Sequence, residues 1–176
     1  MSHVAKKTLG FYREKNEIRK VDLLDLVKSA LKMHSARMAR QNVTVSFVEE
    51  GPVFAEVISV EILQVLSNLI LNSLDAFSAE GGTLAVRIRK RGDGIYIAVA
   101  DNGRGIESAI HQHLFSPHNS SKQFGTGLGL WLSLEIMKKH HGSIVCRTST
   151  RPGNSGTIFR IFLPTSQNSD HLEVIP

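Results

Sequence analysis

The hydrophobic residues of this chain follow two periods, one typical of helices and one typical of strands. Apolar residues recur every three or four positions in residues 22–42, 59–82 and 127–142, which predicts three helices. Asp22 and Ser59 stand where the first two of these begin and are expected to cap them. Elsewhere apolar and polar residues alternate, which predicts six strands. These strands are residues 43–48, 53–57, 83–91, 94–101, 143–149 and 156–164.

Glycine and proline mark the turns between these segments. The pair Gly51-Pro52 predicts a hairpin that joins the first two strands. The pair Gly81-Gly82 is expected to end the second helix. Residues 107–125 form a long connection rich in Ser, His and Gly, and long connections in compact domains are usually functional. The order of the elements predicts a layer of helices packed on one face of a mixed sheet.

Length and composition limit the class of protein. The 176 residues, of which 41% are hydrophobic, are enough for one domain with one core. No run of about eighteen apolar residues is present, so we expect a soluble, cytoplasmic protein that reaches a membrane only through upstream segments, if any exist. The single cysteine, Cys146, cannot form an internal disulfide and is expected to be a buried thiol.

The net charge of +5 is unevenly distributed. Residues 1–40 carry ten Lys and Arg against four Asp and Glu, whereas residues 41–176 carry eleven against twelve. The basic segment lacks the interleaved aromatic residues of a surface that stacks bases. Nucleic-acid binding is therefore the weakest of the functions considered.

The predicted helix at 59–82 is apolar around most of its circumference but carries one polar stripe. Gln64, Asn68, Asn72 and Asp75 follow one another at steps of four, four and three residues, which places them on one side of the helix. Burying amides and a carboxylate costs free energy unless other groups bind them. A hydrogen-bond network with neighbouring loops and a ligand or hydrated metal ion such as Mg²⁺ are both compatible with this stripe.

A flexible, charged corner follows the predicted strand at 94–101. Asp101 ends the strand, and Gly103 and Gly105 allow turns with positive φ and close approach of a planar ligand to the backbone. A carboxylate in this position can accept a hydrogen bond from an exocyclic amine. On its own, the spacing Asp-x-Gly-x-Gly is a weak signal, because it marks many ordinary turns.

The third candidate site is the run "GTGLGL", residues 125–130, which leads directly into the predicted third helix. Glycines at alternate positions expose backbone N–H groups at the positive end of the helix dipole, where phosphates bind. The run lacks the Gly-Lys-Ser/Thr of a P-loop. It also follows a long loop instead of a strand, so it is not a dinucleotide fingerprint.

Taken together, the order and spacing of these motifs resemble the ATP-binding catalytic domain of sensor histidine kinases, in the GHKL or Bergerat-fold superfamily. "QVLSNLILNSLDAF" is similar to the family's N box, "DNGRGI" to its first glycine box and "GTGLGLWLS" to its second. The resemblance implies an α/β (α+β) two-layer sandwich, with a mixed, largely antiparallel sheet packed against about three helices. It covers residues 21–164 and implies that residues 1–20 are the end of a dimerisation helix and a linker. Residues 165–176 are then a polar tail, expected to be disordered.

The resemblance also implies roles for single residues. Asp101 would accept the adenine amine, Asn72 would hold Mg²⁺, and Asn68 would lie close to the phosphates one turn earlier. Lys122 would contact the γ-phosphate, and Asn68 and Lys122 are the implied catalytic residues. The other implied ATP-binding residues are Asp75, Gly103, Gly105, Ile106, Gly125, Thr126, Gly127, Leu128, Gly129, Leu130 and Thr157.

The implied activity is transfer of the γ-phosphoryl group of ATP to a histidine on a dimerisation helix outside this chain, for relay to the receiver domain of a response regulator. Related gyrase-like and chaperone ATPases carry a water-activating Glu where this chain has Asn68. An amide cannot act as a general base near neutral pH, so slow hydrolysis is expected.

Two departures from the family pattern leave alternatives open. None of the eight histidines precedes Asp or Glu, so the usual acceptor is absent, and the chain is not expected to phosphorylate itself alone. The loop "LFSPHNSSK" has His118 and Asn119 where the family commonly has two aromatic residues. A nucleotide-binding regulatory module that acts through protein contact is therefore an alternative. A serine kinase of the anti-sigma type is another, although "LGFYRE" resembles the end of a histidine kinase hairpin.

Overall fold

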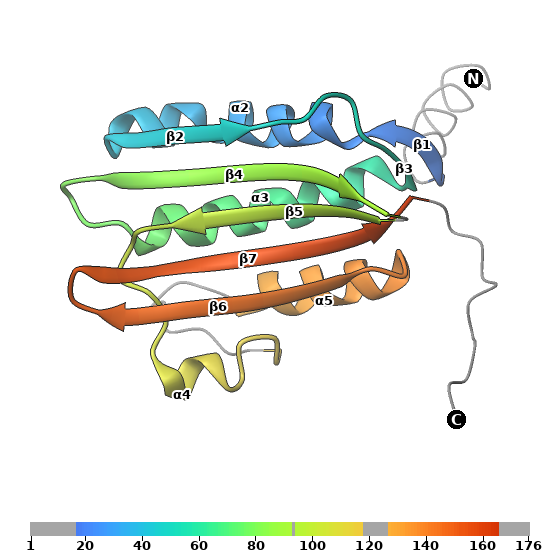
Figure 1. Cartoon of the computed structure of the whole chain (residues 1–176). Coiled ribbons are helices and arrows are strands. Elements are labelled where there is room, and N and C mark those ends of the chain that lie inside the picture. The colour runs from blue at the N-terminus through green and yellow to red at the C-terminus, as the bar shows by residue number, and fades with distance from the viewer. Residues whose placement is uncertain (1–16, 93, 118–126, 166–176) are drawn as a thin grey trace, which may run out of the picture.

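A computed structural model describes residues 17–92, 94–117 and 127–165 of the chain (Figure 1). The helices are α2 (Leu23–Arg40), α3 (Ser59–Ala76), α4 (Ser108–His111) and α5 (Gly129–Lys139). The strands are β1 (Arg19–Asp22), β2 (Val43–Val48), β3 (Phe54–Val57), β4 (Gly82–Arg91), β5 (Gly94–Asp101), β6 (Ser143–Arg151) and β7 (Asn154–Pro164). All three predicted helices and all six predicted strands are present, together with β1 and the short α4.

Five strands form one mixed sheet in the order β2-β4-β5-β7-β6. Strand β2 runs parallel to β4, and the other neighbours are antiparallel. Helices α2, α3 and α5 lie on one face of this sheet (Figure 1). The predicted two-layer sandwich with a mixed, largely antiparallel sheet is therefore confirmed.

The predicted hairpin at Gly51-Pro52 is wrong. Strand β2 joins the large sheet, whereas β3 pairs with β1 in a separate two-stranded sheet. The start of α2 explains this arrangement, because one Asp22 carboxylate oxygen accepts hydrogen bonds from both Leu24 N and Val53 N, each at 3.0 Å. Asp22 thus caps α2 as predicted and also holds the chain that enters β3.

The predicted ends of α3 also need correction. Ser59 is the first helical residue instead of the cap, and Ile58 in the capping position makes no side-chain hydrogen bond. The helix ends at Ala76, well before Gly82, because Phe77 is extended. The Phe77 ring then packs against Gly82. A Cβ atom on Gly82 would lie only 2.2 Å from the nearest atom of this ring. Gly82 instead begins β4, beside this ring.

Several predictions concern residues outside the described ranges. These are the dimerisation-helix end within residues 1–16, the diverged loop at 118–126 and the polar tail at 166–176. Among the helices that the structure does describe, none combines the length and the apolar character needed to cross a bilayer.

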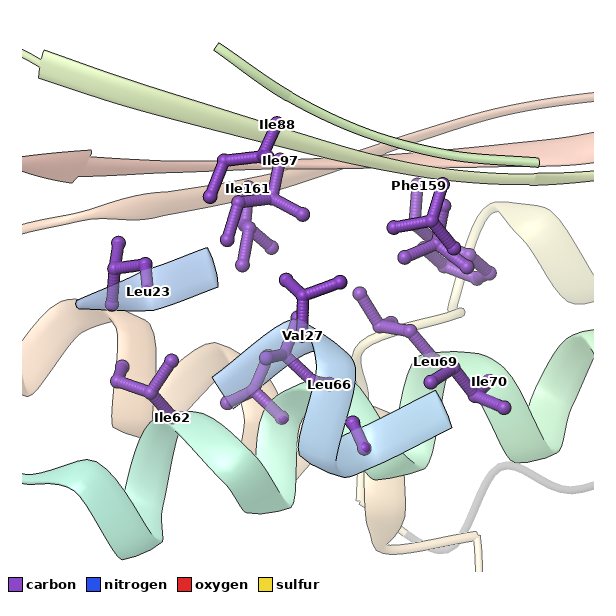
Figure 2. Packing of buried hydrophobic residues seen from close by; sticks show 14 of the residues in the cluster. Leu23, Val27, Ile62, Leu66, Leu69, Ile70, Ile88, Ile97, Phe159 and Ile161 are labelled. Carbon is purple, nitrogen blue, oxygen red and sulfur yellow. The ribbon is translucent and has the colours of Figure 1, made fainter. Parts of the chain in front are cut away.

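The hydrophobic core lies between α3 and the sheet. Leu66 and Leu69 of α3 are at most 1% exposed and face the sheet, from which Ile97 and Phe159 point back toward them (Figure 2). Burying a leucine fully stabilises a domain by roughly 1.5–3 kcal/mol before any cavity term is added. Packing of α3 is consequently a main source of stability.

Replacing Leu69 by Ala is expected to lower the free energy of unfolding by about 3 kcal/mol, because the lost contacts leave a cavity. Val60→Ala on the same helix is the matched control, since Val60 is 42% exposed. It should change stability by less than about 0.5 kcal/mol. Urea unfolding followed by circular dichroism measures both; similar losses in the two variants would contradict this description of the core.

A buried histidine joins the end of α5 to the start of α3. His140 is 1% exposed, and its Nε2 lies 3.0 Å from a carboxylate oxygen of Glu61. Burial lowers the pKa of His140 below its ordinary value, against the opposing effect of Glu61, while Lys139 and His141 lower the pKa further. His140 is therefore neutral in the folded chain at neutral pH.

This shift predicts a dependence of stability on pH. As pH falls below about 6.5, the unfolded chain binds a proton at residue 140 that the folded chain takes up only at lower pH. The free energy of unfolding should therefore decrease between pH 7.5 and 5.5, and His140→Gln should show a smaller decrease. His113→Asn, at an exposed position, serves as the control. Urea titrations at both pH values give the slopes, and equal slopes for wild type and His140→Gln would refute this origin.

Candidate functional site

The polar stripe of α3 is divided between solvent and two neighbouring helices. Gln64 is exposed, whereas Asn68, Asn72 and Asp75 are half-buried. The predicted stripe is thus buried only along the second half of the helix, where β5 ends and α5 begins nearby.

Asn68 ties α3 to the first turn of α5. Its amide nitrogen donates to the carbonyl oxygen of Gly129 at 3.1 Å and to Ser133 Oγ at 3.2 Å. The Ser133 hydroxyl is fully buried and donates to the same Gly129 carbonyl at 2.9 Å. A glutamate at position 68 would set a carboxylate against this carbonyl, so the local packing itself favours an amide.

Asp75 turns to the other side, toward α2. It forms an ion pair with Arg37, whose Nε donates to Gln41 Oε1 at 3.2 Å. Gln41 in turn donates to the carbonyl oxygen of Leu74 at 3.3 Å. The role of Arg37 is not predictable from the sequence, because nothing in a single sequence links two residues 38 positions apart.

The start of α5 has backbone features that suit a ligand with negative charge. Leu128 in the capping position makes no side-chain hydrogen bond to the first turn, and Gly127 adopts a φ of +66° just before it. Backbone N–H groups at such a helix start, together with the helix dipole, attract anions. Lys122, Gly125 and Thr126, predicted to complete this site, lie outside the described residues.

Asp101 stands at the end of β5 as predicted, and both its carboxylate oxygens are engaged. Oδ1 accepts hydrogen bonds from Gly103 N at 3.0 Å and Thr157 N at 3.2 Å. Oδ2 accepts one from the hydroxyl of Ser73, a fully buried residue of α3, at 2.9 Å. One carboxylate thereby joins α3, the glycine corner and β7.

Burial raises the pKa of Asp101 above its ordinary value, although the three hydrogen bonds oppose this shift. The pKa of the Cys146 thiol is raised to about 12. Burial is the larger cause, and the negative charge of Asp101 is the smaller one. Cys146 is therefore a neutral thiol. It is half-buried instead of fully buried as predicted.

The two glycines of the corner have packing partners in the protein. A Cβ at position 103 would lie 2.7 Å from the Cβ of Ala76, and one at position 105 would lie 2.1 Å from the carbonyl oxygen of Ser149. Gly105 also has a φ of +76°, which side chains rarely adopt. These glycines let the corner fit between the end of α3 and β6, a reason that the sequence analysis did not identify.

Thr148 of β6 connects the corner to β7. Its hydroxyl accepts a hydrogen bond from Ile106 N at 2.8 Å and donates to the carbonyl oxygen of Gly156 at 2.9 Å. It also lies 3.2 Å from the hydroxyl of Thr157, which is 5% exposed. The sequence analysis predicted Ile106 and Thr157 as site residues but missed Thr148 and Ser73, since small hydroxyl residues carry little signal by themselves.

Asn68 and Ser73 are five residues apart on α3. Asn68 contacts the start of α5, and Ser73 contacts Asp101. At 1.5 Å per residue, this spacing places Asn68 and Ser73 about 7.5 Å apart along the axis of α3. Asn72 lies between them. The described residues contain no cluster of three or more His, Cys, Asp or Glu side chains that could enclose a metal ion.

Comparison with known proteins identifies the family. Residues 57–167 match the family described as "Histidine kinase-, DNA gyrase B-, and HSP90-like ATPase". The chain belongs to this family. The matched region contains α3, the Asp101 corner and α5, which together form the site described above.

Sensor proteins and sensor histidine kinases are among the curated relatives of the chain. The chain is 43% identical over 101 residues to the C4-dicarboxylate transport sensor protein DctB of Rhizobium meliloti, covering 57% of this chain and 16% of DctB. It is 33% identical over 149 residues to the sensor histidine kinase ZraS of Klebsiella oxytoca, covering 83% of this chain and 31% of ZraS. The chain thus spans less than a third of either relative.

Solved structures confirm the fold. The catalytic domain of histidine kinase ThkA has a TM-score of 0.76 at 23% identity, covering 85% of this chain and 97% of that domain. ThkA in complex with the response regulator TrrA has a TM-score of 0.68 at 22% identity, covering 93% of this chain and 48% of that one. Together with the family match and the curated relatives, this likeness of fold confirms the resemblance that the sequence motifs indicate.

Replacing Thr148 by Val removes the hydroxyl that satisfies Ile106 N and the carbonyl of Gly156. A fully buried donor or acceptor without a partner costs roughly 1–3 kcal/mol, and these groups are half-buried, so the free energy of unfolding should fall by about 1 kcal/mol. Thr150→Val, at an exposed position of the same strand, should change it by less than about 0.5 kcal/mol. Chemical denaturation measures the free energy of unfolding of both variants. Equal values would show that the Thr148 network does not contribute to stability.

Proposed function

We propose that this domain binds ATP together with Mg²⁺ and supplies the phosphoryl donor half of a histidine kinase. One observation carries this proposal: Ser73 and Asn68 of α3 hydrogen-bond to the Asp101 carboxylate at the end of β5 and to the first turn of α5, so a single helix positions both. Adenine and the phosphates of ATP need these two kinds of site. Membership of the family and the sensor kinases among its relatives support the same reading.

At the adenine end, Asp101 accepts a hydrogen bond from the exocyclic amine of the base. Its two oxygens are already oriented by Ser73, Gly103 and Thr157, so little conformational freedom is lost on binding. Backbone from Gly103 to Ile106, held by Thr148, forms the wall beside the base. Thr157 lies under the carboxylate from the side of β7.

At the phosphate end, the N–H groups of Gly129 and Leu130 and the helix dipole of α5 bind negative charge. The preceding residues Gly127 and Leu128 continue this wall. Asn68 fixes the helix start through Gly129 and so acts as a positioning residue beside the phosphates. Lys122, Gly125 and Thr126 complete the phosphate site in this proposal.

The residues present fit a magnesium ion that is shared with the nucleotide. Because the described residues offer no carboxylate cluster, the ion would take most of its ligands from phosphates and water, as Mg²⁺ commonly does. Asn72 is half-buried between the two ends of the site and would provide the protein ligand. When bound, the ion neutralises charge on the phosphates. Asp75, paired with Arg37, adds no net charge next to them.

Phosphoryl transfer from this site requires an acceptor from another part of the full protein. The chain has no histidine followed by an acidic residue, so the proposed acceptor is a histidine on the protein's own dimerisation helix. Relay to the receiver domain of a response regulator follows from the same proposal. The alternative, a nucleotide-binding module that acts by contact alone, is favoured by the same absence of an acceptor.

The test combines the chain with a separately purified dimerisation hairpin that carries an acceptor histidine and with γ-labelled ATP and Mg²⁺. We expect acid-labile, base-stable label on the hairpin, and no label on the chain alone. Asn72→Ala should lower the rate of transfer at least about tenfold by removing the metal ligand. Gln64→Ala, two turns earlier on the same helix and exposed, should leave the rate within about twofold.

Two outcomes would change the conclusion. ATP binding without transfer to any hairpin tested would favour the regulatory module. Equal rates for Asn72→Ala and wild type would exclude Asn72 as the metal ligand.

A further inference from the structure

The face of the sheet opposite the helices has no cover among the described elements. Helices α2, α3 and α5 all lie behind the sheet, and its front face is open (Figure 1). Residues that alternate with the core positions therefore point to solvent from four strands. On this front face stand Ala85, Arg87, Arg89, Tyr96, Ala98, Ala100, Val145, Arg147, Ile158, Arg160 and Phe162.

The front face is positively charged. Among its described residues in the five strands there is no Asp or Glu. Arg89 pairs with Glu50 of the loop after β2 at 2.9 Å. The side chains of Arg87, Arg147 and Arg160 are exposed and have no hydrogen bond or ion pair with any described residue. The balance of eleven basic and twelve acidic residues in 41–176 conceals this segregation of charge.

The arginines flank a floor of small residues. Ala98 of β5 lies directly between Arg87 on β4 and Arg160 on β7. Neighbouring strands are about 4.8 Å apart, so the Cα atoms of these two arginines are about 10 Å apart across Ala98. The next row has Ala85, Ala100 and Ile158 side by side, and Arg147 beyond them. An α-helix with its side chains is about 10 Å wide, which matches this spacing.

The geometry points to a docking surface for an acidic amphipathic helix of a protein partner. Its apolar side would lie on the alanine floor along β5, and its Asp or Glu side chains would meet Arg87, Arg147 and Arg160. Guanidinium groups that have no partner in the part of the chain the structure describes suit this task, because they bind carboxylates in bidentate fashion and are more weakly hydrated than ammonium groups. This inference does not depend on nucleotide binding.

Two other classes of partner fit the front face less well. A surface that binds single-stranded nucleic acid needs free aromatic faces for the bases. The two aromatic residues here, Tyr96 and Phe162, pack on each other with ring centroids 5.1 Å apart, and Phe162 also covers Gly94. A membrane surface needs a continuous set of apolar groups that stand beyond the charged ones. In β4 to β7, the large exposed apolar residues of the described front face are Val145 and Tyr96, which lie on separate strands, and the alanines lie below the arginines.

The test uses a fluorescein-labelled peptide of about twenty residues with Glu and Leu at helical spacing, titrated with the whole chain in low salt. We expect binding that weakens as salt increases and that weakens at least tenfold in the double variant Arg87→Ala, Arg160→Ala. The matched control is Lys32→Ala, Arg40→Ala, which removes two exposed basic residues of α2 and should change the affinity less than twofold. A second variant, Ala98→Glu, places a negative charge on the alanine floor. This charge repels the Glu residues of the peptide and should abolish binding.

Three results would overturn the proposal. The first is absence of binding to the wild-type chain, and the second is equal binding of a peptide with Gln in place of Glu. The third is binding to oligo-dT, or to vesicles of phosphatidylserine and phosphatidylcholine, that is tighter than binding to the peptide. This result would indicate that the front face binds nucleic acid or a membrane instead of an acidic helix. Circular dichroism and urea midpoints confirm that the variants are folded before their affinities are compared.

Discussion

Helix α3 is in contact with the sheet, with α2 and with α5 at once, and the position of the whole site follows from this packing. Its leucines and isoleucines bury against the sheet, which fixes the rotation of the helix about its axis. That rotation directs Asn68 toward α5 and Asp75 toward α2. Because the apolar contacts hold the helix, the polar residues are kept in place without relying on a ligand.

Asp101 shows how stability and chemistry are combined in one group. Its carboxylate is buried enough to raise its pKa, yet three donors from α3, the corner and β7 hold it. Burial of a charged group costs free energy, and the hydrogen bonds offset part of that cost. The result is an acceptor that is oriented before any ligand arrives. Close packing of Gly103 and Gly105 against Ala76 and Ser149 keeps the surrounding backbone in the same position.

Much of this molecule was predictable from local patterns, because periodicity and caps depend on neighbouring residues. The three main helices, the strands and the Asp22 cap are examples. The partners of β2 and β3 were not, since strand pairing depends on contacts between distant segments. The same holds for Arg37, Ser73 and Thr148, which gain their roles only from what the fold places beside them. The basic front face was also hidden, because net charge does not report where charges lie.

The central claim is that the end of β5 presents a carboxylate, Asp101, to an adenine ring, and that Ser73 of α3 helps to preorganise it. Calorimetric titration of ATP with Mg²⁺ into wild type and Asp101→Asn, at fixed ionic strength, tests it most directly. The asparagine oxygen can still accept from Gly103 N and Thr157 N, so the variant should fold, but its amide would face the adenine amine as a second donor. The account predicts that binding to wild type is measurable and weakens at least about 30-fold in the variant. Equal affinity in a folded Asp101→Asn variant would contradict it.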